Sequence, residues 1–312
     1  MSSQTELPAP NLTPQLVPYL VTTTPVFNIP HPTRAPTSTP AQSELSGYVI
    51  FDDTVGDNSQ IFLLNLETRD ISQLTKHGSN YDPVWSPDGT KIAYESSPSH
   101  GEASDIYIMN ADGTMQVPVV KCSGIEQSPA WSPDSNKLAF VSNCDEFSNE
   151  IYILDIQTGN ITQLTKNTNS DLDPAWSPDG TRIAFAEERG VTGFMDIFIM
   201  NVDGTNKTHI VEGGPAWHPV WCSNGACIIY EFGTGPQGRI RKLMTIDLHS
   251  RESKPLLSSY ANDFETDIWL PSLSPVRGYV VFNIGFELYA MDLEKSRLFP
   301  LGLHALNGKL YP

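Results

Sequence analysis

The sequence lacks long hydrophobic runs and is poor in basic residues. No stretch approaches the roughly 18 consecutive apolar residues of a transmembrane helix, and Met1 is followed by polar residues, so no signal peptide is visible in this chain. The chain has 19 Lys and Arg against 36 Asp and Glu, which gives a net charge of −17. A surface this acidic repels phosphate groups, so we expect no nucleic-acid partner and no membrane insertion.

Recognisable catalytic and metal-binding motifs are also missing. The sequence contains no Gly-x-Ser-x-Gly elbow, and its seven histidines show no His-x-x-x-His spacing. We therefore expect no catalytic residue and no cofactor. A calcium ion is the one metal that the acidic clusters could hold, at Asp52, Asp53 and Asp57 or at Asp171 and Asp173. Neither cluster has the ordered spacing of an EF-hand, and a solvated acidic loop is the commoner interpretation.

What the sequence does contain is a repeat. Trp85, Trp131, Trp176 and Trp221 follow one another at intervals of 46, 45 and 45 residues. Each ends a strand-like run and precedes a turn, as in DPVWSPDGTKIAY from Asp82. Weaker copies begin at Leu270 and Gly47. A period near 45 that consists of strand and turn signals is typical of a β-propeller, with one four-stranded antiparallel blade per repeat.

Six such repeats fill residues 46–312, which predicts an all-β, six-bladed propeller. The chain enters the ring at the second strand of blade one, so the innermost strand of that blade must come from elsewhere. Lys309-Leu-Tyr-Pro312 resembles the run before each Trp, and we expect it to close the ring. Residues 1–45 hold nine of the 25 prolines and eight threonines, which predicts a disordered tail or linker.

The Trp residues and the turns that follow them are interpreted as structural. In Ser86-Pro87-Asp88-Gly89, proline presets the backbone for a type I turn and glycine accepts the left-handed position after it. A large ring at the end of each inner strand would fill the wedge between two blades.

The four cysteines can form two sterically sensible pairs. Cys222 and Cys227 flank one hairpin turn, while Cys122 lies in a connection between blades and Cys144 in a loop on the same rim. Two disulfides would indicate an extracytoplasmic location, periplasmic or secreted. The alternative is four unpaired thiols in a cytosolic protein.

The Trp-Ser-Pro-Asp-Gly turns and the segment Asp196-Ile-Phe-Ile-Met-Asn-Val-Asp-Gly204 resemble the propeller of the TolB family, over roughly residues 46–312. That resemblance implies a six-bladed propeller of the cell envelope that binds a partner protein at the mouth of its channel. TolB itself carries an N-terminal α/β domain, whereas a Pro/Thr-rich segment stands in that place here.

We expect the partner-binding residues on the loop-rich face, where the position four residues before each Trp varies between blades. Large rings there are good anchors for a protein or peptide. The candidates are Trp217, His218, Trp269, Tyr81, Asp82, Glu126, Asp171, Asp173, His100, Glu187 and Glu188.

The sequence thus predicts a non-catalytic, monomeric binding or scaffold propeller. The alternative is a carbohydrate-active hydrolase or lyase with its site in the central channel. A third interpretation, based on the Pro/Thr-rich segment, is a sensor or stalk domain of a wall-attached assembly.

Overall fold

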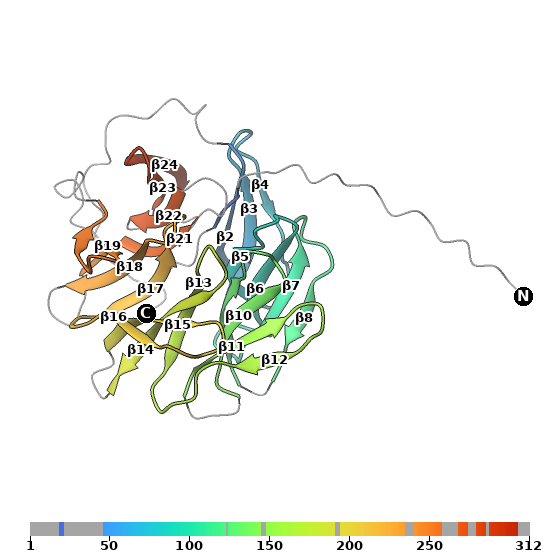
Figure 1. Cartoon of the computed structure of the whole chain (residues 1–312). Helices are drawn as coiled ribbons and strands as arrows, with labels where there is room; N and C mark the ends of the chain where they lie inside the picture. The colour runs from blue at the N-terminus through green and yellow to red at the C-terminus, as the bar shows by residue number, and fades with distance from the viewer. Residues whose placement is uncertain are drawn as a thin grey trace, which may run out of the picture.

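The protein is described here by a computed structural model, which covers residues 19–21, 46–122, 124–144, 148–190, 194–234, 240–257, 268–273, 279–284 and 287–304. These residues form six four-stranded sheets, arranged in a ring about a common axis (Figure 1). They contain no α-helix, and hence no helix that is long and apolar enough to cross a membrane. The prediction of a six-bladed, all-β propeller is confirmed.

Within each blade, the strands are numbered outward from the strand nearest the axis. The strands of blades one to three are β1 (Tyr19–Val21), β2 (Tyr48–Val55), β3 (Asn58–Asn65), β4 (Ile71–Gln73), β5 (Ser79–Trp85), β6 (Lys91–Ser97), β7 (Asp105–Asn110), β8 (Val117–Val120), β9 (Glu126–Trp131), β10 (Lys137–Ser142), β11 (Glu150–Asp155) and β12 (Ile161–Gln163). Those of blades four to six are β13 (Asp171–Trp176), β14 (Arg182–Arg189), β15 (Phe194–Asn201), β16 (Thr208–Val211), β17 (Ala216–Trp221), β18 (Cys227–Thr234), β19 (Ile240–Asp247), β20 (Ser253–Pro255), β21 (Ile268–Leu273), β22 (Tyr279–Ile284), β23 (Glu287–Asp292) and β24 (Arg297–His304).

Blade one differs from the prediction in its innermost strand. That position is occupied by β1, which pairs parallel with β2 in the register Tyr19 to Tyr48 and Val21 to Ile50. A segment expected to be part of a disordered tail therefore supplies a strand, and blade one is mixed rather than purely antiparallel. The physical reason is that Tyr-Leu-Val is an apolar, β-prone triplet that covers the inner edge of β2. The predicted closing strand, Lys309–Pro312, lies outside the described residues.

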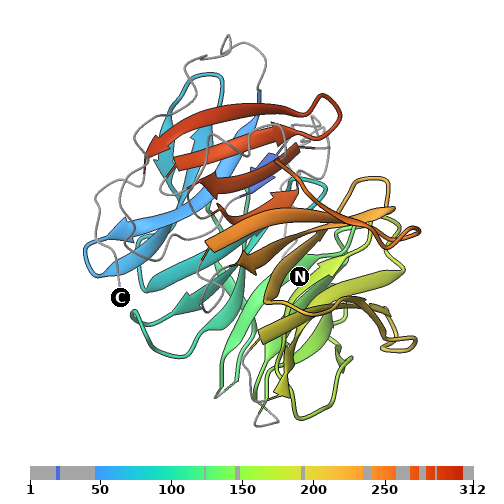
Figure 2. The ribbon, with the colours of Figure 1, turned by 90° about the vertical axis from the view of Figure 1, so that its left-hand side faces the viewer.

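The hydrophobic core is divided into six clusters, one at each interface between neighbouring blades. The cluster between blades six and one joins Val49 and Leu64 to Val281, Ala290 and Leu301. Figure 2 shows the red strands of blade six beside the blue strands of blade one. Side-chain packing therefore closes the ring, and each blade is stabilised mainly by its two neighbours.

The turns after the inner strands have the structural role that the sequence predicted. In blade four, Ser177 Oγ donates to Asp179 Oδ1 at 2.6 Å, and the Thr181 amide donates to the same oxygen at 3.0 Å. These hydrogen bonds lower the pKa of Asp179 to about 2, because they stabilise its charged form. Ser86 with Asp88 and Ser132 with Asp134 repeat the arrangement.

The repeated Trp residues connect neighbouring blades. The indole Nε1 of Trp131, Trp176 and Trp221 donates to a backbone carbonyl of the preceding blade, at Val84, Ala130 and Ala175 respectively, over 3.0 to 3.2 Å. The indole thus fills the wedge between two sheets and also satisfies a carbonyl there.

Trp176→Phe should lower the free energy of unfolding by about 1–2 kcal/mol, because it removes the inter-blade hydrogen bond to Ala130. Trp217→Phe is the matched control, since Trp217 is also half-buried but has no indole hydrogen bond among the described residues. Urea unfolding of both variants would test this, and equal losses would contradict it.

Candidate functional site

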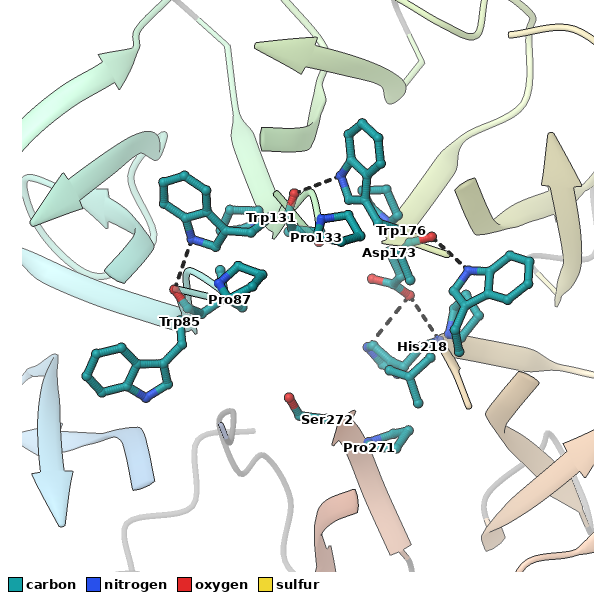
Figure 3. Close-up of a pocket in the computed structure, with 18 of the residues that line it drawn as sticks. Trp85, Pro87, Trp131, Pro133, Asp173, Trp176, His218, Pro271 and Ser272 are labelled. Carbon is teal, nitrogen blue, oxygen red and sulfur yellow. Dashed lines mark hydrogen bonds and ion pairs between the residues drawn. The ribbon is translucent and has the colours of Figure 1, made fainter. Parts of the chain in front are cut away.

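A cavity of about 420 Å³ lies in the central channel, between the middle of the inner strands and the turns that follow them (Figure 3). Its wall is mostly proline and aromatic surface with a few polar groups. The lining residues are Asp82, Val84, Trp85, Pro87, Ser128, Pro129, Ala130, Trp131, Pro133, Asp173, Pro174, Ala175, Trp176, Pro178, His218, Pro219, Val220, Trp221, Ser223, Pro271 and Ser272.

The wall is shaped by one β-bulge per blade in blades two to six. In blade two, Tyr81 pairs with Glu95 and Val84 with Ala93, so Asp82 and Pro83 together face the single residue Tyr94. The same shift recurs in the other four blades. In every case the second bulge residue is proline, which has no amide hydrogen to donate to the ladder and therefore suits this position.

The first bulge residue in four of these blades has a left-handed backbone. The φ angles of Asp82, Ser128, Asp173 and His218 are 46°, 52°, 54° and 46°. Among residues other than glycine, Asp and His are enriched in this region. Because a bulge redirects the side chain that it carries, these four polar residues line the cavity from four successive blades.

Hydrogen bonds between blades hold these residues in place. The amide of Ser128 donates to Glu95 Oε1 of the preceding blade at 2.7 Å, and the amide of His218 donates to Asp173 Oδ2 at 3.3 Å. Carboxyl groups therefore satisfy backbone donors that the bulges remove from the ladder. The positions of the cavity residues are coupled to the packing of the ring.

A charged network lies on the side of the channel formed by blades four and five. His218 Nδ1 is 3.0 Å from Glu231 Oε1, and its Nε2 is 3.7 Å from Asp173 Oδ2 (Figure 3). Arg241 Nη1 lies 3.0 Å from the other oxygen of Glu231, whose side chain is fully buried. Burial lowers the pKa of His218, but the negative charges of Asp173 and Glu231 outweigh it and raise this pKa to about 9.

A second network of carboxyl groups lies between blades one and two. Burial raises the pKa of Glu95 well above its usual value, and the charge of Asp82 raises it further. Burial likewise raises the pKa of Asp82 and of Asp52, and Ser59 Oγ donates to Asp52 Oδ2 at 3.0 Å. This side of the channel therefore holds protons at a pH at which an exposed carboxyl group would be ionised.

The structure brings three of the predicted residues together, because Asp82, Asp173 and His218 all line the cavity. The predicted Glu126 and Asp171 are 0% exposed, which removes them from the expected contact surface. Each is engaged inside the protein, Glu126 beside Ser142 and Asp171 beside Asn167. For Asp171, burial raises the pKa to about 6.

The other predicted residues do not line the cavity. Tyr81 Oη contacts His100 Nδ1 at 2.6 Å, and Glu187 pairs with Lys207. Trp217 packs against the core between blades four and five, with the Arg241 guanidinium 5.0 Å from its ring centroid. Glu188 is half-buried in β14. Trp269 lies in β21, and its side chain is outside the described residues.

Sequence reasoning did not single out Ser128, Glu95 and Glu231, and it predicted partner contacts on the loop-rich face, at the start of the inner strands. A usable signal was present. The residue before the bulge proline, three positions before each Trp, is Asp, Ser, Asp and His in successive blades. Glu95 and Glu231 each follow the aromatic residue of a second strand, where other blades carry Val141 and Ala186.

The predicted disulfides Cys122–Cys144 and Cys222–Cys227 are present, with Cα separations of 6.2 and 5.3 Å. No finding bears on the predicted calcium ion. Among the described residues, a group of three potential metal ligands occurs at Cys122, Glu126 and Cys144, away from both acidic clusters that were proposed for calcium.

The fold and the channel cavity define a propeller with a ligand-sized site on its axis. Residues 101–291, more than half of the chain, match the family described as the TolB beta propeller domain. The chain belongs to this family.

The relatives and similar structures agree with that assignment. The Tol-Pal system protein TolB of Francisella tularensis subsp. mediasiatica (strain FSC147) is 32% identical over 79 residues, which are 25% of this chain and 18% of that protein. The Protein TolB homolog of Chlorobium luteolum is 32% identical over 130 residues, or 40% of this chain and 28% of that protein. The matched segments thus span less than a third of each of these relatives.

Two solved structures illustrate how widely the fold is used. The crystal structure of TolB from Acinetobacter baumannii superposes with a TM-score of 0.67 at 20% identity, covering 86% of this chain and 66% of that one. An oligogalacturonate lyase in complex with manganese superposes with a TM-score of 0.56 at 18% identity, covering 81% and 73%. At these identities the likeness shows the fold alone.

Proposed function

We propose that this protein is a non-catalytic binding propeller that accommodates a peptide segment of a partner protein in its central channel. The observation that carries the proposal is the cavity itself. Its volume of about 420 Å³ falls in the usual range of ligand sites, and it combines an apolar wall with a few convergent polar groups.

The wall chemistry suits a peptide. Proline rings, such as those of Pro133 and Pro178, offer flat contacts for apolar or aromatic side chains. Between them, the carboxyl groups of Asp82 and Asp173 and the hydroxyl groups of Ser128 and Ser272 can accept hydrogen bonds from peptide amides. Membership of the TolB propeller family, whose relatives include Tol-Pal system proteins, also supports a protein partner.

The charge state of His218 argues against a general base at this position. With a pKa of about 9, its ring is protonated at neutral pH and lacks the free lone pair that a general base needs. The ring instead acts as a fixed positive group between Asp173 and Glu231. A carbohydrate-active hydrolase or lyase with its site in the same channel is the second candidate, and the likeness in fold to oligogalacturonate lyase is the reason to test it.

The proposed location is extracytoplasmic, in the cell envelope or the extracellular space. The two disulfides support it, because such bonds persist in oxidising compartments.

Blocking the cavity should abolish peptide binding. Ser223 is exposed in the turn at the edge of the cavity, so Ser223→Trp would place a large ring there without disturbing the core. Peptides would first be selected from a random library on the wild-type protein, and their affinities measured by calorimetry. We expect Ser223→Trp to weaken binding by at least tenfold, or about 1.4 kcal/mol.

Lys254→Trp is the matched control, since Lys254 is exposed on the outer strand β20 and is not part of the cavity wall. Peptides that bind Ser223→Trp and the wild type equally would contradict a channel site. Cleavage of oligosaccharides by the wild type, lost in Ser223→Trp, would favour the enzyme.

A further inference from the structure

Two cysteines and a glutamate converge at the edge of blade three, away from the channel cavity. Cys122 lies in the connection between β8 and β9, Glu126 is the first residue of β9, and Cys144 follows β10. Glu126 Oε1 is 2.6 Å from Cys122 Sγ and 2.8 Å from Cys144 Sγ. One carboxyl oxygen is therefore in contact with both sulfur atoms.

The backbone around this cluster is firmly held. The Glu126 amide donates to the Ser104 carbonyl at 2.9 Å, and Ser104 Oγ donates to the Glu126 carbonyl at 2.8 Å. The amide of Ile125 donates to Asn143 Oδ1 at 2.9 Å. At Gly124 a Cβ atom would lie 2.4 Å from the same Oδ1, so a larger residue there would displace the Asn143 side chain. The three side chains are thus preorganised by the fold.

One oxygen of the buried Glu126 carboxyl group lacks a hydrogen-bond partner among the described residues. Glu126 is 0% exposed, and its Oε2 has no hydrogen-bond partner among the described residues. Its Oε1 accepts from Ser142 Oγ at 3.1 Å, but the sulfurs of a disulfide carry no proton to donate. A buried acid without adequate donors is costly unless something else compensates it.

We propose that, once the Cys122–Cys144 disulfide is reduced, Cys122, Cys144 and Glu126 bind a thiophilic divalent metal ion of the zinc type. Their potential ligand atoms all lie within 4.8 Å of one another. Two thiolates and one carboxylate form a ligand set that suits zinc, cobalt or cadmium better than calcium or magnesium. The bound cation would also supply a counter-charge for the buried carboxylate.

The exchange between the two states is chemically balanced. A dithiol or phosphine reductant supplies two electrons, and two protons complete the cleavage of the sulfur–sulfur bond to two thiols. Metal binding then releases those two protons as the thiolates form. Both cysteines are half-buried rather than enclosed, so reductant and metal can reach them. The cluster is thus a redox-gated metal site that an oxidising compartment keeps in its disulfide form.

Cobalt(II) provides the direct test. The full-length protein is reduced with a phosphine under anaerobic conditions, freed of reductant and titrated with cobalt(II). We expect a sulfur-to-cobalt charge-transfer band that saturates at one ion per chain. The band should persist in Cys222→Ser/Cys227→Ser, which retains the proposed site, and vanish in Cys122→Ser/Cys144→Ser. Glu126→Gln should weaken binding by at least about tenfold, since changes even to outer-shell partners of a metal have effects of that size.

Alkylation of the reduced wild type keeps the test valid if a variant fails to fold. Zinc should protect Cys122 and Cys144 from iodoacetamide, while Cys222 and Cys227 react at the same rate with or without metal, as located by mass spectrometry. The proposal is overturned if no charge-transfer band appears, if the band survives in Cys122→Ser/Cys144→Ser, or if the disulfide cannot be reduced in the folded protein.

Discussion

Raising the pH from 6 to 10 should remove about 3 kcal/mol of stability that depends on His218. The folded-state pKa of His218 is about 9, above the unfolded value near 6.5, because Asp173 and Glu231 bind the charged ring. A group whose pKa is raised in this way contributes its full stabilisation below pH 6.5. That contribution is lost as the pH rises through 9.

His218→Gln isolates this effect from the other groups that titrate over the same range. Denaturant unfolding of both proteins at intervals of one pH unit should give a difference in unfolding free energy that is largest near pH 6, falls as the pH rises through 9 and is constant near pH 10. The buried carboxyl groups of Asp52 and Glu95, whose pKa values are also raised by burial, are present in both proteins. A difference that does not change with pH would mean that the ring of His218 is not held in its charged form.

Phe185→Ala should lower the free energy of unfolding by about 3–5 kcal/mol. Phe185 is 0% exposed, belongs to the cluster between blades three and four, and lies 5.9 Å from the ring of Phe198 in a stacked arrangement. Removing the ring would leave a cavity between two sheets that the rigid ladder of β14 and β15 cannot close. Denaturant titration with circular dichroism measures the change directly.

Phe194→Ala is the matched control for that substitution. Phe194 lies on β15 of the same sheet but is 37% exposed, so its loss should amount to about 1 kcal/mol or less. Similar losses at both positions would contradict the conclusion that the core lies between the blades.

Much of the fold could be predicted from local signals. The Trp spacing and the Ser-Pro-Asp-Gly turns gave the number of blades because each repeat carries the same strand periodicity and the same turn chemistry. Strand β1 was missed because Tyr19–Val21 is only three residues long, lies next to Pro18 and Thr22, and has no periodicity to detect.

The candidate site was harder to predict, since the residues that line it are set by the register between the inner and second strands of each blade. Glu126 and Asp171 were expected at the surface because their positions in the repeat place them on the loop-rich face. The fold instead encloses them beside Ser142 and Asn167. To predict the cavity, one must know that the bulge proline and the residue before it together face a single residue of the second strand. This register is set only when the strands pair in the sheet.

The left-handed bulges limit how such a channel can diversify. A β-branched or bulky apolar side chain before the bulge proline would be strained, whereas Asp, Asn, His, Ser and Gly adopt that backbone more readily. A new binding specificity in this scaffold could therefore arise by exchanging the polar residue before the bulge proline in individual blades, while the Trp and Pro residues stay the same. In the present chain these residues are Asp, Ser, Asp and His in blades two to five.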